Sequence, residues 1–219
     1  MDFYLARLPV FKALPPRELE NLGRIFQLQR FTRKEAVFEE GGTPEAVFLL
    51  RSGLVKAVKH SPSDEVLAME VVVPGQLFGM IAALDKKPYP VSALCLRDCE
   101  VYRVRTPEFD RLMTGFGDFA RGVYSEVGRH LRHAQAARAL AKEPAAKRIA
   151  YMLLRLWEAL GKDLAVRRED IAELTGCTQG TVIRTLADFR KRRLISSGWK
   201  RLSLLSPERL KAAAGWGDF

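Results

Sequence analysis

The sequence contains little cysteine and no long run of apolar residues. Its cysteines are Cys95, Cys99 and Cys177. Three is too small a number for a disulfide framework, and an odd number cannot all pair within the chain, which favours a reducing compartment. No stretch approaches the roughly 18 uninterrupted apolar residues that a membrane-spanning helix requires. Residues 1–4, Met-Asp-Phe-Tyr, lack the basic region and apolar run of a secretion signal. We therefore expect a cytoplasmic protein with no membrane contact.

Histidine is equally scarce, which bears on metal chemistry. A metal-dependent enzyme on a roll fold needs several histidines and a carboxylate that converge inside the barrel. Of the three histidines, only His60 falls in the region rich in strand-forming residues, whereas His130 and His133 lie in a helical segment. We therefore expect neither an enzyme nor a metal site. A cupin-like metalloenzyme is the alternative from another functional class.

The charge that is present is basic and unevenly distributed. The chain carries 36 Lys and Arg against 26 Asp and Glu, a net charge of +10 over 219 residues, a length that suits two domains. Residues 145–219 contain 15 basic and 8 acidic residues, so +7 of the charge belongs to the C-terminal third. Such a concentration is typical of a domain that neutralises phosphates, although a basic surface without a partner gives the same count.

The N-terminal half changes pattern after a short helical segment that begins at Pro15-Pro16. Between residues 31 and 104, short runs rich in Val, Phe, Leu and Tyr alternate with turn clusters, and the clearest runs are residues 45–50, 54–59 and 66–73. Strands at this spacing predict a small sandwich, jelly roll or barrel.

A helical period follows over residues 107–141. Apolar residues recur at intervals of three and four, and the predicted length exceeds what a small roll covers, which favours a seam between two subunits. The residues assigned to this dimerisation seam are Phe116, Val123, Val127, Leu131 and Ala134. The alternative is a surface helix packed on its own sheet. Pro144 then breaks the helix, and residues 145–160 predict a new one that buries Ile149, Leu153, Leu156 and Trp157.

Residues 168–190 predict a helix, a tight turn and a second helix. Gly176 permits the turn, Thr178 caps the second helix, and an apolar stripe of Val182, Leu186 and Phe189 faces inward. Two short strands around Gly198 then predict a wing. The residues expected to contact DNA are Thr178, Gln179, Gly180, Thr181, Arg184, Arg190 and Lys200. A winged helix used for protein contacts is the alternative.

Stretches in both halves resemble one family. They are residues 176–184, Gly-Cys-Thr-Gln-Gly-Thr-Val-Ile-Arg, with Leu194-Ile195, and residues 40–42, 48–53 and 74–79 in the N-terminal half. Over nearly its full length the chain resembles the cyclic-AMP receptor protein and fumarate-nitrate-reduction regulator (Crp/Fnr) family of bacterial transcription regulators.

The resemblance implies an α+β fold with three parts. These are a β-roll sensor domain of the cyclic-nucleotide-binding, jelly-roll type over residues 1–106, a long dimerisation helix over 107–141 and a winged helix-turn-helix over 145–219. It also implies a homodimer that binds palindromic operators in double-stranded DNA and recruits or blocks RNA polymerase.

The resemblance assigns roles in the second helix of the helix-turn-helix. Arg184 matches the family arginine that contacts guanine, and a guanidinium pairs bidentately with guanine O6 and N7. Gln179 lies where the family often has a longer basic or polar residue, and it suits adenine or a phosphate. Gly180 departs from the frequent family glutamate, so we expect an operator that differs from the family consensus.

The sensor half departs further from the family. Members that bind cyclic AMP supply a glutamate and an arginine, where this chain has Met80 and either Pro90 or Val91. The candidate sensor pocket comprises Gly79, Met80, Ile81, Val91, Ser92, His130, Ala134 and Gln135, the last two at the family's base-contacting pair. A phosphate without a cation in such an apolar site carries a heavy desolvation cost, so we expect no cyclic AMP response and no cofactor.

The sequence disfavours an iron-sulfur sensor and leaves a haem sensor or a regulator without a ligand as alternatives. An iron-sulfur cluster needs four thiolates, which three cysteines do not supply. A haem is not excluded, because the histidines and Met80 are ligands in principle, but ordinary surface histidines and a core methionine explain them equally. A regulator with no small ligand is a further alternative. Cys95 and Cys99 are best explained as small buried apolar residues.

Overall fold

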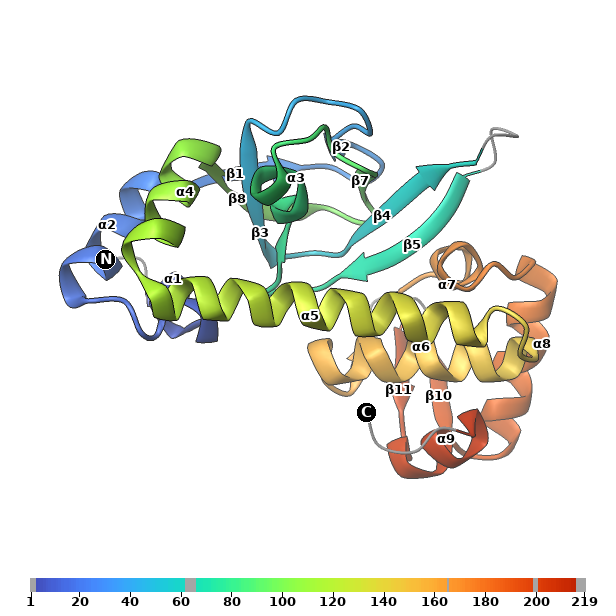
Figure 1. Ribbon diagram of the computed structural model, residues 1–219. Helices are drawn as coiled ribbons and strands as arrows, with labels where there is room; N and C mark the ends of the chain where they lie inside the picture. The colour runs from blue at the N-terminus through green and yellow to red at the C-terminus, as the bar shows by residue number, and fades with distance from the viewer. Residues whose placement is uncertain (1–2, 62–65, 165, 199–200, 216–219) are drawn as a thin grey trace. The chain divides into compact units, whose positions relative to one another are not determined.

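The computed structural model describes residues 3–61, 66–164, 166–198 and 201–215. The chain divides into two compact units, which we describe separately (Figure 1). The first comprises Met1–His60 with Val71–His133, and the second comprises Ser61–Glu70 with Ala134–Phe219.

Two four-stranded sheets form the N-terminal roll. One has the order β1-β8-β3-β6 and the other the order β2-β7-β4-β5. The strands are β1 (Gln27–Phe31), β2 (Ala36–Phe38), β3 (Ala46–Ser52), β4 (Val55–His60), β5 (Val66–Val72), β6 (Leu77–Phe78), β7 (Ser92–Cys95) and β8 (Cys99–Arg105). The β-roll predicted from the short apolar runs is therefore confirmed, and the three clearest runs correspond to β3, β4 and β5.

Short helices cover the first sheet of the roll. They are α1 (Phe3–Arg7), the 3-10 turn η1 (Pro9–Phe11), α2 (Pro16–Ile25), α3 (Met80–Asp85) and α4 (Thr106–Gly115). Helix α2 has proline at its first position, where no backbone donor is needed, as the Pro15-Pro16 pair predicts. The core between these helices and the sheet contains the fully buried Phe11, Phe109 and Phe119, whose rings lie 5.7–5.9 Å apart in successive pairs.

The long helix is interrupted, which the apolar period did not predict. Helix α4 ends at Gly115 and α5 (Gly117–Leu140) begins two residues later, with Phe116 at extended angles of φ −137° and ψ 98°. Glycine weakens a helix by about 0.5–1 kcal/mol relative to alanine, and two glycines flank the break. The single continuous helix expected over residues 107–141 is therefore wrong, although the residues on both sides of Phe116 are helical as predicted.

Only some residues of the predicted dimer seam are exposed and open to a second subunit. Val123 is fully buried in the core of its own roll, and Phe116 and Val127 pack against the same core. Leu131 and Ala134 are exposed, as is the unpredicted Tyr124. The N-terminal half of α5 therefore matches the alternative of a helix packed on its own sheet, because its apolar side chains complete the roll.

The second unit is a winged helix. Its elements are α6 (Ala145–Leu160), β9 (Asp163–Leu164), α7 (Arg168–Thr175), α8 (Gln179–Lys191), β10 (Ile195–Gly198), β11 (Arg201–Leu204) and α9 (Pro207–Ala214), with the sheet order β10-β11-β9. Helix α6 has the bounds that the sequence predicts and buries Ile149, Leu153 and Leu156, but Trp157 is only half-buried. Strands β10 and β11 pair antiparallel from Ile195–Leu204 to Gly198–Arg201, which confirms the wing.

Two glycines with positive φ allow a matched test of packing in the roll. A Cβ at Gly53 would lie 2.4 Å from Cys99 Sγ and 2.8 Å from the Asp98 carbonyl oxygen, whereas one at Gly41 would meet nothing within 4 Å. Alanine at either position incurs the left-handed backbone cost of about 1–2 kcal/mol. We expect Gly53→Ala to lose a further ~1–3 kcal/mol through overpacking. Urea denaturation measures both, and equal losses would contradict the close contact.

Candidate DNA-binding surface and the interior of the roll

The turn between α7 and α8 is built by two local features. Gly176 takes a left-handed conformation with φ 61°, which ends α7, and the Cys177 N–H then donates to the Ala172 carbonyl at 3.0 Å. Thr178 caps α8, because its Oγ1 accepts a hydrogen bond from the Thr181 N–H at 3.3 Å. Both features are those that the sequence predicts, and together they set the direction in which α8 leaves the turn.

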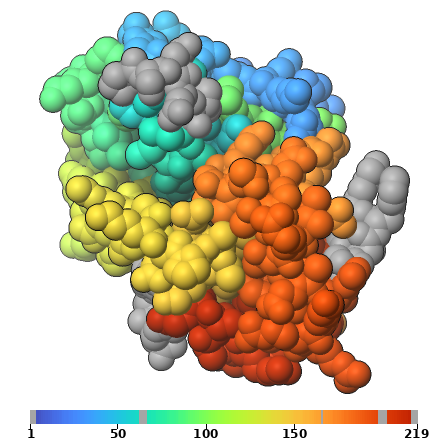
Figure 2. All heavy atoms as spheres, turned by 90° about the vertical axis from the view of Figure 1, so that its right-hand side faces the viewer, coloured from blue at the N-terminus to red at the C-terminus, as the bar shows by residue number. Residues whose placement is uncertain are grey.

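One side of α8 is buried and the opposite side is exposed. Val182, Leu186 and Phe189 are the buried residues of the helix. Gln179, Gly180 and Arg184 are exposed and Thr181 is half-buried, as predicted for the outer face. Figure 2 shows α7 and α8, in orange, at the surface of the second unit. A polar face at the start of an exposed helix is the arrangement by which recognition helices reach base edges.

A short chain of hydrogen bonds holds the Arg184 side chain. Its Nη2 donates to Thr181 Oγ1 at 3.2 Å, and that hydroxyl lies 3.0 Å from Thr178 Oγ1. A Cβ built on Gly180 would meet only the Arg184 guanidinium, at 3.6 Å from Nη1. The guanidinium therefore lies beside the bare backbone of Gly180 and is exposed; Nη2 uses one of its two N–H groups on Thr181, and the remaining donors of the fork suit a base or phosphate.

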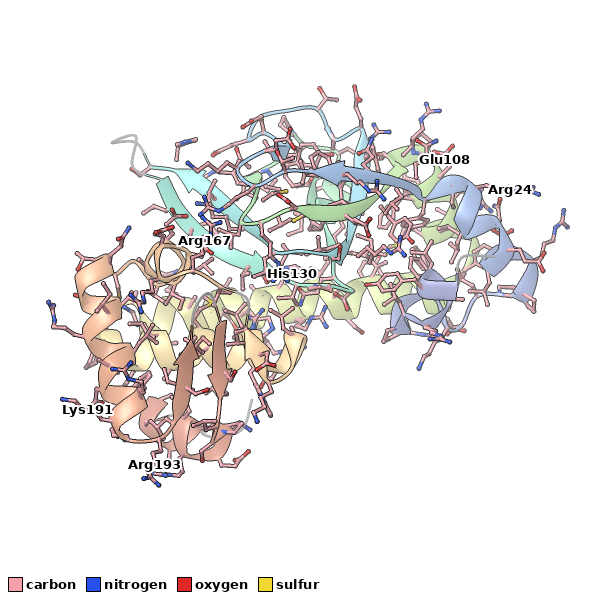
Figure 3. The ribbon with its side chains drawn as sticks, turned by 180° about the vertical axis from the view of Figure 1, so that it is seen from behind. Arg24, Glu108, His130, Arg167, Lys191 and Arg193 are labelled. Atoms are coloured by element: carbon pink, nitrogen blue, oxygen red, sulfur yellow. The ribbon has the colours of Figure 1, made fainter. Side chains whose placement is uncertain are left out.

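The far end of α8 is strongly basic. Arg190 and Lys191 lie in its last turn and are exposed. Lys191 and Arg193 project away from the helix (Figure 3). Arg192 instead pairs with Asp188 at 3.5 Å on the same helix. Lys200, the predicted contact in the wing, lies outside the described residues. The basic end therefore offers charges suited to phosphates, but no geometry that distinguishes one base from another.

Sequence reasoning missed Arg148 of α6. Its Nη1 donates to the Ala141 carbonyl at 2.9 Å, and its Nη2 lies 3.2 Å from Cys177 Sγ. One guanidinium thus ties the residue after α5 to the turn before α8. Arg148 also borders a cavity of about 330 Å³ lined by Ala68, Ala137, Leu140, Ala141, Tyr151, Met152, Leu174, Thr175 and Gly176. No sequence motif marks this residue, because its partners are backbone and a thiol.

The residues of the candidate sensor pocket differ in exposure and in their surroundings. Met80 is 2% exposed and belongs to the buried core cluster that also contains Val47 and Leu49, which agrees with the core-methionine alternative, whereas Ile81 is 47% exposed. Val91 and His130 are half-buried, and Ala134 and Gln135 are exposed in the second unit. The buried Ser92 is already engaged: its Oγ accepts from the Glu40 N–H at 2.9 Å and donates to Glu39 Oε2 at 3.2 Å.

Aromatic rings fill the interior of the roll instead. Phe38 stacks on Tyr89 with centroids 4.0 Å apart, and Phe48 and Phe78 lie within 5.5–6.0 Å of Phe38. The Tyr89 hydroxyl donates to the Ala46 carbonyl at 2.6 Å, and burial raises the pKa of this phenol. A Cβ at the pocket residue Gly79 would approach three of these rings to 3.2–3.3 Å. Among the described residues of the roll, the buried polar side chains are Gln76 and Ser92, and no Lys or Arg is buried there.

The remaining sulfur and histidine groups have ordinary surroundings. Cys95 and Cys99 are buried in the roll, as expected of small apolar residues. A hydrogen bond between them lowers the pKa of Cys99 and raises that of Cys95, and burial raises the latter further. His60 is exposed at the end of β4 and does not point into the roll.

Among the residues that the structure describes, no three or more His, Cys, Asp and Glu side chains gather as a metal site would require. Within the same ranges, no helix combines the length and apolar character needed to cross a membrane.

Both halves of the chain match models of known protein families. Residues 28–115 match the family described as "Cyclic nucleotide-binding domain", and residues 147–213 match "Crp-like helix-turn-helix domain". The chain belongs to the Crp/Fnr family of transcription regulators. A Crp/Fnr regulator is a DNA-binding protein, and its helix-turn-helix domain is the part that implies DNA binding.

Relatives match this Crp/Fnr regulator along most of its length. The "Cyclic AMP receptor protein" of Thermus thermophilus is 28% identical over 180 residues, 81% of this chain and 83% of the relative. "Transcriptional activator protein Anr" of Pseudomonas protegens is 28% identical over 224 residues, 98% and 91% of the two chains. The crystal structure of TTHB099 from Thermus thermophilus, 28% identical, superposes with a TM-score of 0.70 over 86% of this chain and 97% of its own. Such relatives are transcription regulators and not enzymes.

The cap of α8 provides a test of how the surface is positioned. Thr178→Ala removes the acceptor for the Thr181 N–H and one link of the hydroxyl chain to Arg184. We expect a loss of about 0.5–2 kcal/mol in unfolding free energy, the usual cost of losing an N-cap. Thr178→Ser keeps the acceptor and is the matched control. Thermal or urea denaturation measures both, and equal stability of the alanine and serine variants would contradict the role of the cap.

Proposed function

We propose that two copies of this regulator bind a palindromic operator, with α8 of each copy in the major groove. The observation that carries the proposal is the opposition of the buried Val182-Leu186-Phe189 stripe to an exposed face that presents Arg184. In this arrangement Arg184 pairs with guanine through O6 and N7, and Gln179 contacts an adenine or a phosphate. Thr178 and Thr181 contribute hydroxyls beside them.

The exposed part of α5 supports a homodimer. Tyr124 and Leu131 are 60% and 58% exposed and stand seven residues apart, the spacing that keeps side chains on one face of paired helices. A second copy of this chain would bury both side chains and Ala134. The resulting symmetry explains a palindromic operator, because two recognition helices related by a two-fold axis read two inverted half-sites. RNA polymerase is the further partner of the DNA-bound dimer, in the cytoplasm.

The same regulator is proposed to act without a cyclic nucleotide. The Thermus relative is named a cyclic AMP receptor protein, but in this chain Met80 belongs to the core and Ser92 is engaged by Glu39 and Glu40. Aromatic rings occupy the interior of the roll, and a phosphate placed beside them would lose its hydration with no cation in return.

Operator binding by Arg184→Ala tests the proposed readout. We expect a loss of about 1–3 kcal/mol on the selected operator, with relaxed preference at one base pair, because a bidentate contact disappears. Arg190→Ala is the matched control. Losing a phosphate contact should weaken binding to the operator and to random DNA equally, and should lower the slope of log affinity against log salt concentration by about 1. Fluorescence anisotropy across a salt series measures both. Equal losses of Arg184→Ala on operator and random DNA would contradict base readout.

Calorimetry of the purified protein tests the proposal for the sensor half. We expect no heat of binding for cyclic AMP at micromolar concentration and no change in operator affinity when it is added. An absorption spectrum of the same sample reports any haem through its Soret band. Micromolar binding of cyclic AMP would overturn this part of the proposal and leave the DNA-binding part intact.

A further inference from the structure

The recognition helix exposes one large apolar side chain on its DNA-facing side. Ile183 is 46% exposed, whereas its neighbour Val182 is fully buried. Because residues three and four apart share a helix face, Ile183 lies on the same face as Gln179 and Gly180 and directly beside Arg184. This is the face that carries the proposed base contacts.

Folding within the chain does not account for isoleucine at this position. An exposed side chain contributes little burial, and β-branching makes isoleucine a weaker helix former than alanine or leucine. Single exposed apolar residues are common on protein surfaces. The position of Ile183 among the groups that face a base edge is what distinguishes it from Leu28, which is 40% exposed on β1.

The local geometry leaves Ile183 open to a partner. Gly180, one turn earlier on the same face, has no side chain, and a Cβ there would meet only the guanidinium of Arg184 within 4 Å. That guanidinium is directed toward Thr181, with Nη2 at 3.2 Å from its hydroxyl. The face therefore presents a bare backbone, an apolar branched side chain and a cation in adjacent places.

The chemistry of the major groove offers one apolar group, the C5-methyl of thymine. We propose that Ile183 contacts a thymine methyl in a base pair adjacent to the guanine read by Arg184, and so helps to specify the operator. Gly180 allows the helix to approach closely enough for this contact. The inference rests on the proposed function, because it requires α8 to lie in the major groove.

The experiment removes the methyl group from the DNA. Operators are first selected from random duplexes with the full-length wild-type protein. Each thymine of the selected half-site is then replaced by deoxyuracil, which keeps the base pairing and deletes only the C5-methyl. We expect one position to weaken wild-type binding about fourfold per half-site, the equivalent of one buried methyl group. In Ile183→Ala the same replacement should change affinity less than about twofold, the scatter expected between independent sites.

Two control variants distinguish loss of this contact from the effect of shortening any exposed apolar side chain. Leu28→Ala removes a comparably exposed side chain from the roll and should keep the wild-type penalty for deoxyuracil. Ile183→Val shortens the side chain and should give an intermediate penalty. Because Ile183 is exposed and alanine favours helix, folding of the alanine variant is not at risk, and circular dichroism verifies it.

The outcomes distinguish the inference from the proposed function. If Ile183→Ala keeps the full deoxyuracil penalty, or if no thymine flanks the selected guanine, the inference is wrong while operator binding stands. If the wild-type protein selects no DNA sequence at all, the proposed function itself fails. A penalty in the wild type that disappears in Ile183→Ala, is intermediate in Ile183→Val and persists in Leu28→Ala supports the thymine contact.

Discussion

Burial of three apolar side chains along α8 is the constraint on which the DNA-binding surface depends. Each of Val182, Leu186 and Phe189 contributes about 1.5–3 kcal/mol when fully removed from water. Rotating α8 to present another face would expose all three side chains. The free energy of their burial therefore also fixes which residues lie on the opposite, exposed face. The positions of Gln179, Gly180, Ile183 and Arg184 therefore follow from packing on the other side of the helix.

The helix-turn-helix was predictable because its determinants are local. The apolar spacing of α8, the left-handed Gly176 and the threonine cap all act within a few residues, and the structure confirms each. The interruption before α5 was not predictable from the same period. Phe116 continues the apolar spacing, but its backbone is extended between two glycines, and a side-chain pattern carries no information about that angle.

The interior of the roll was harder to predict because its features depend on distant segments. Phe38, Phe48, Phe78 and Tyr89 come from β2, β3, β6 and the loop before β7, and only the pairing of these strands brings their rings together. Likewise, Val123 has the spacing of a dimer contact, but the short N-terminal helices of its own roll bury it. Periodicity identifies an apolar face and does not say which surface covers it.

The basic end of α8 has a consequence for the response to ions. Arg190 and Lys191 lie where the helix dipole is negative, and each stabilises the helix by about 0.3–1 kcal/mol at low ionic strength. Their attraction to phosphates is screened over the same range of salt. Rising ionic strength therefore weakens the helix and, in the proposed complex, its attraction to the duplex, so that salt acts on the folding equilibrium and on DNA occupancy through the same two side chains.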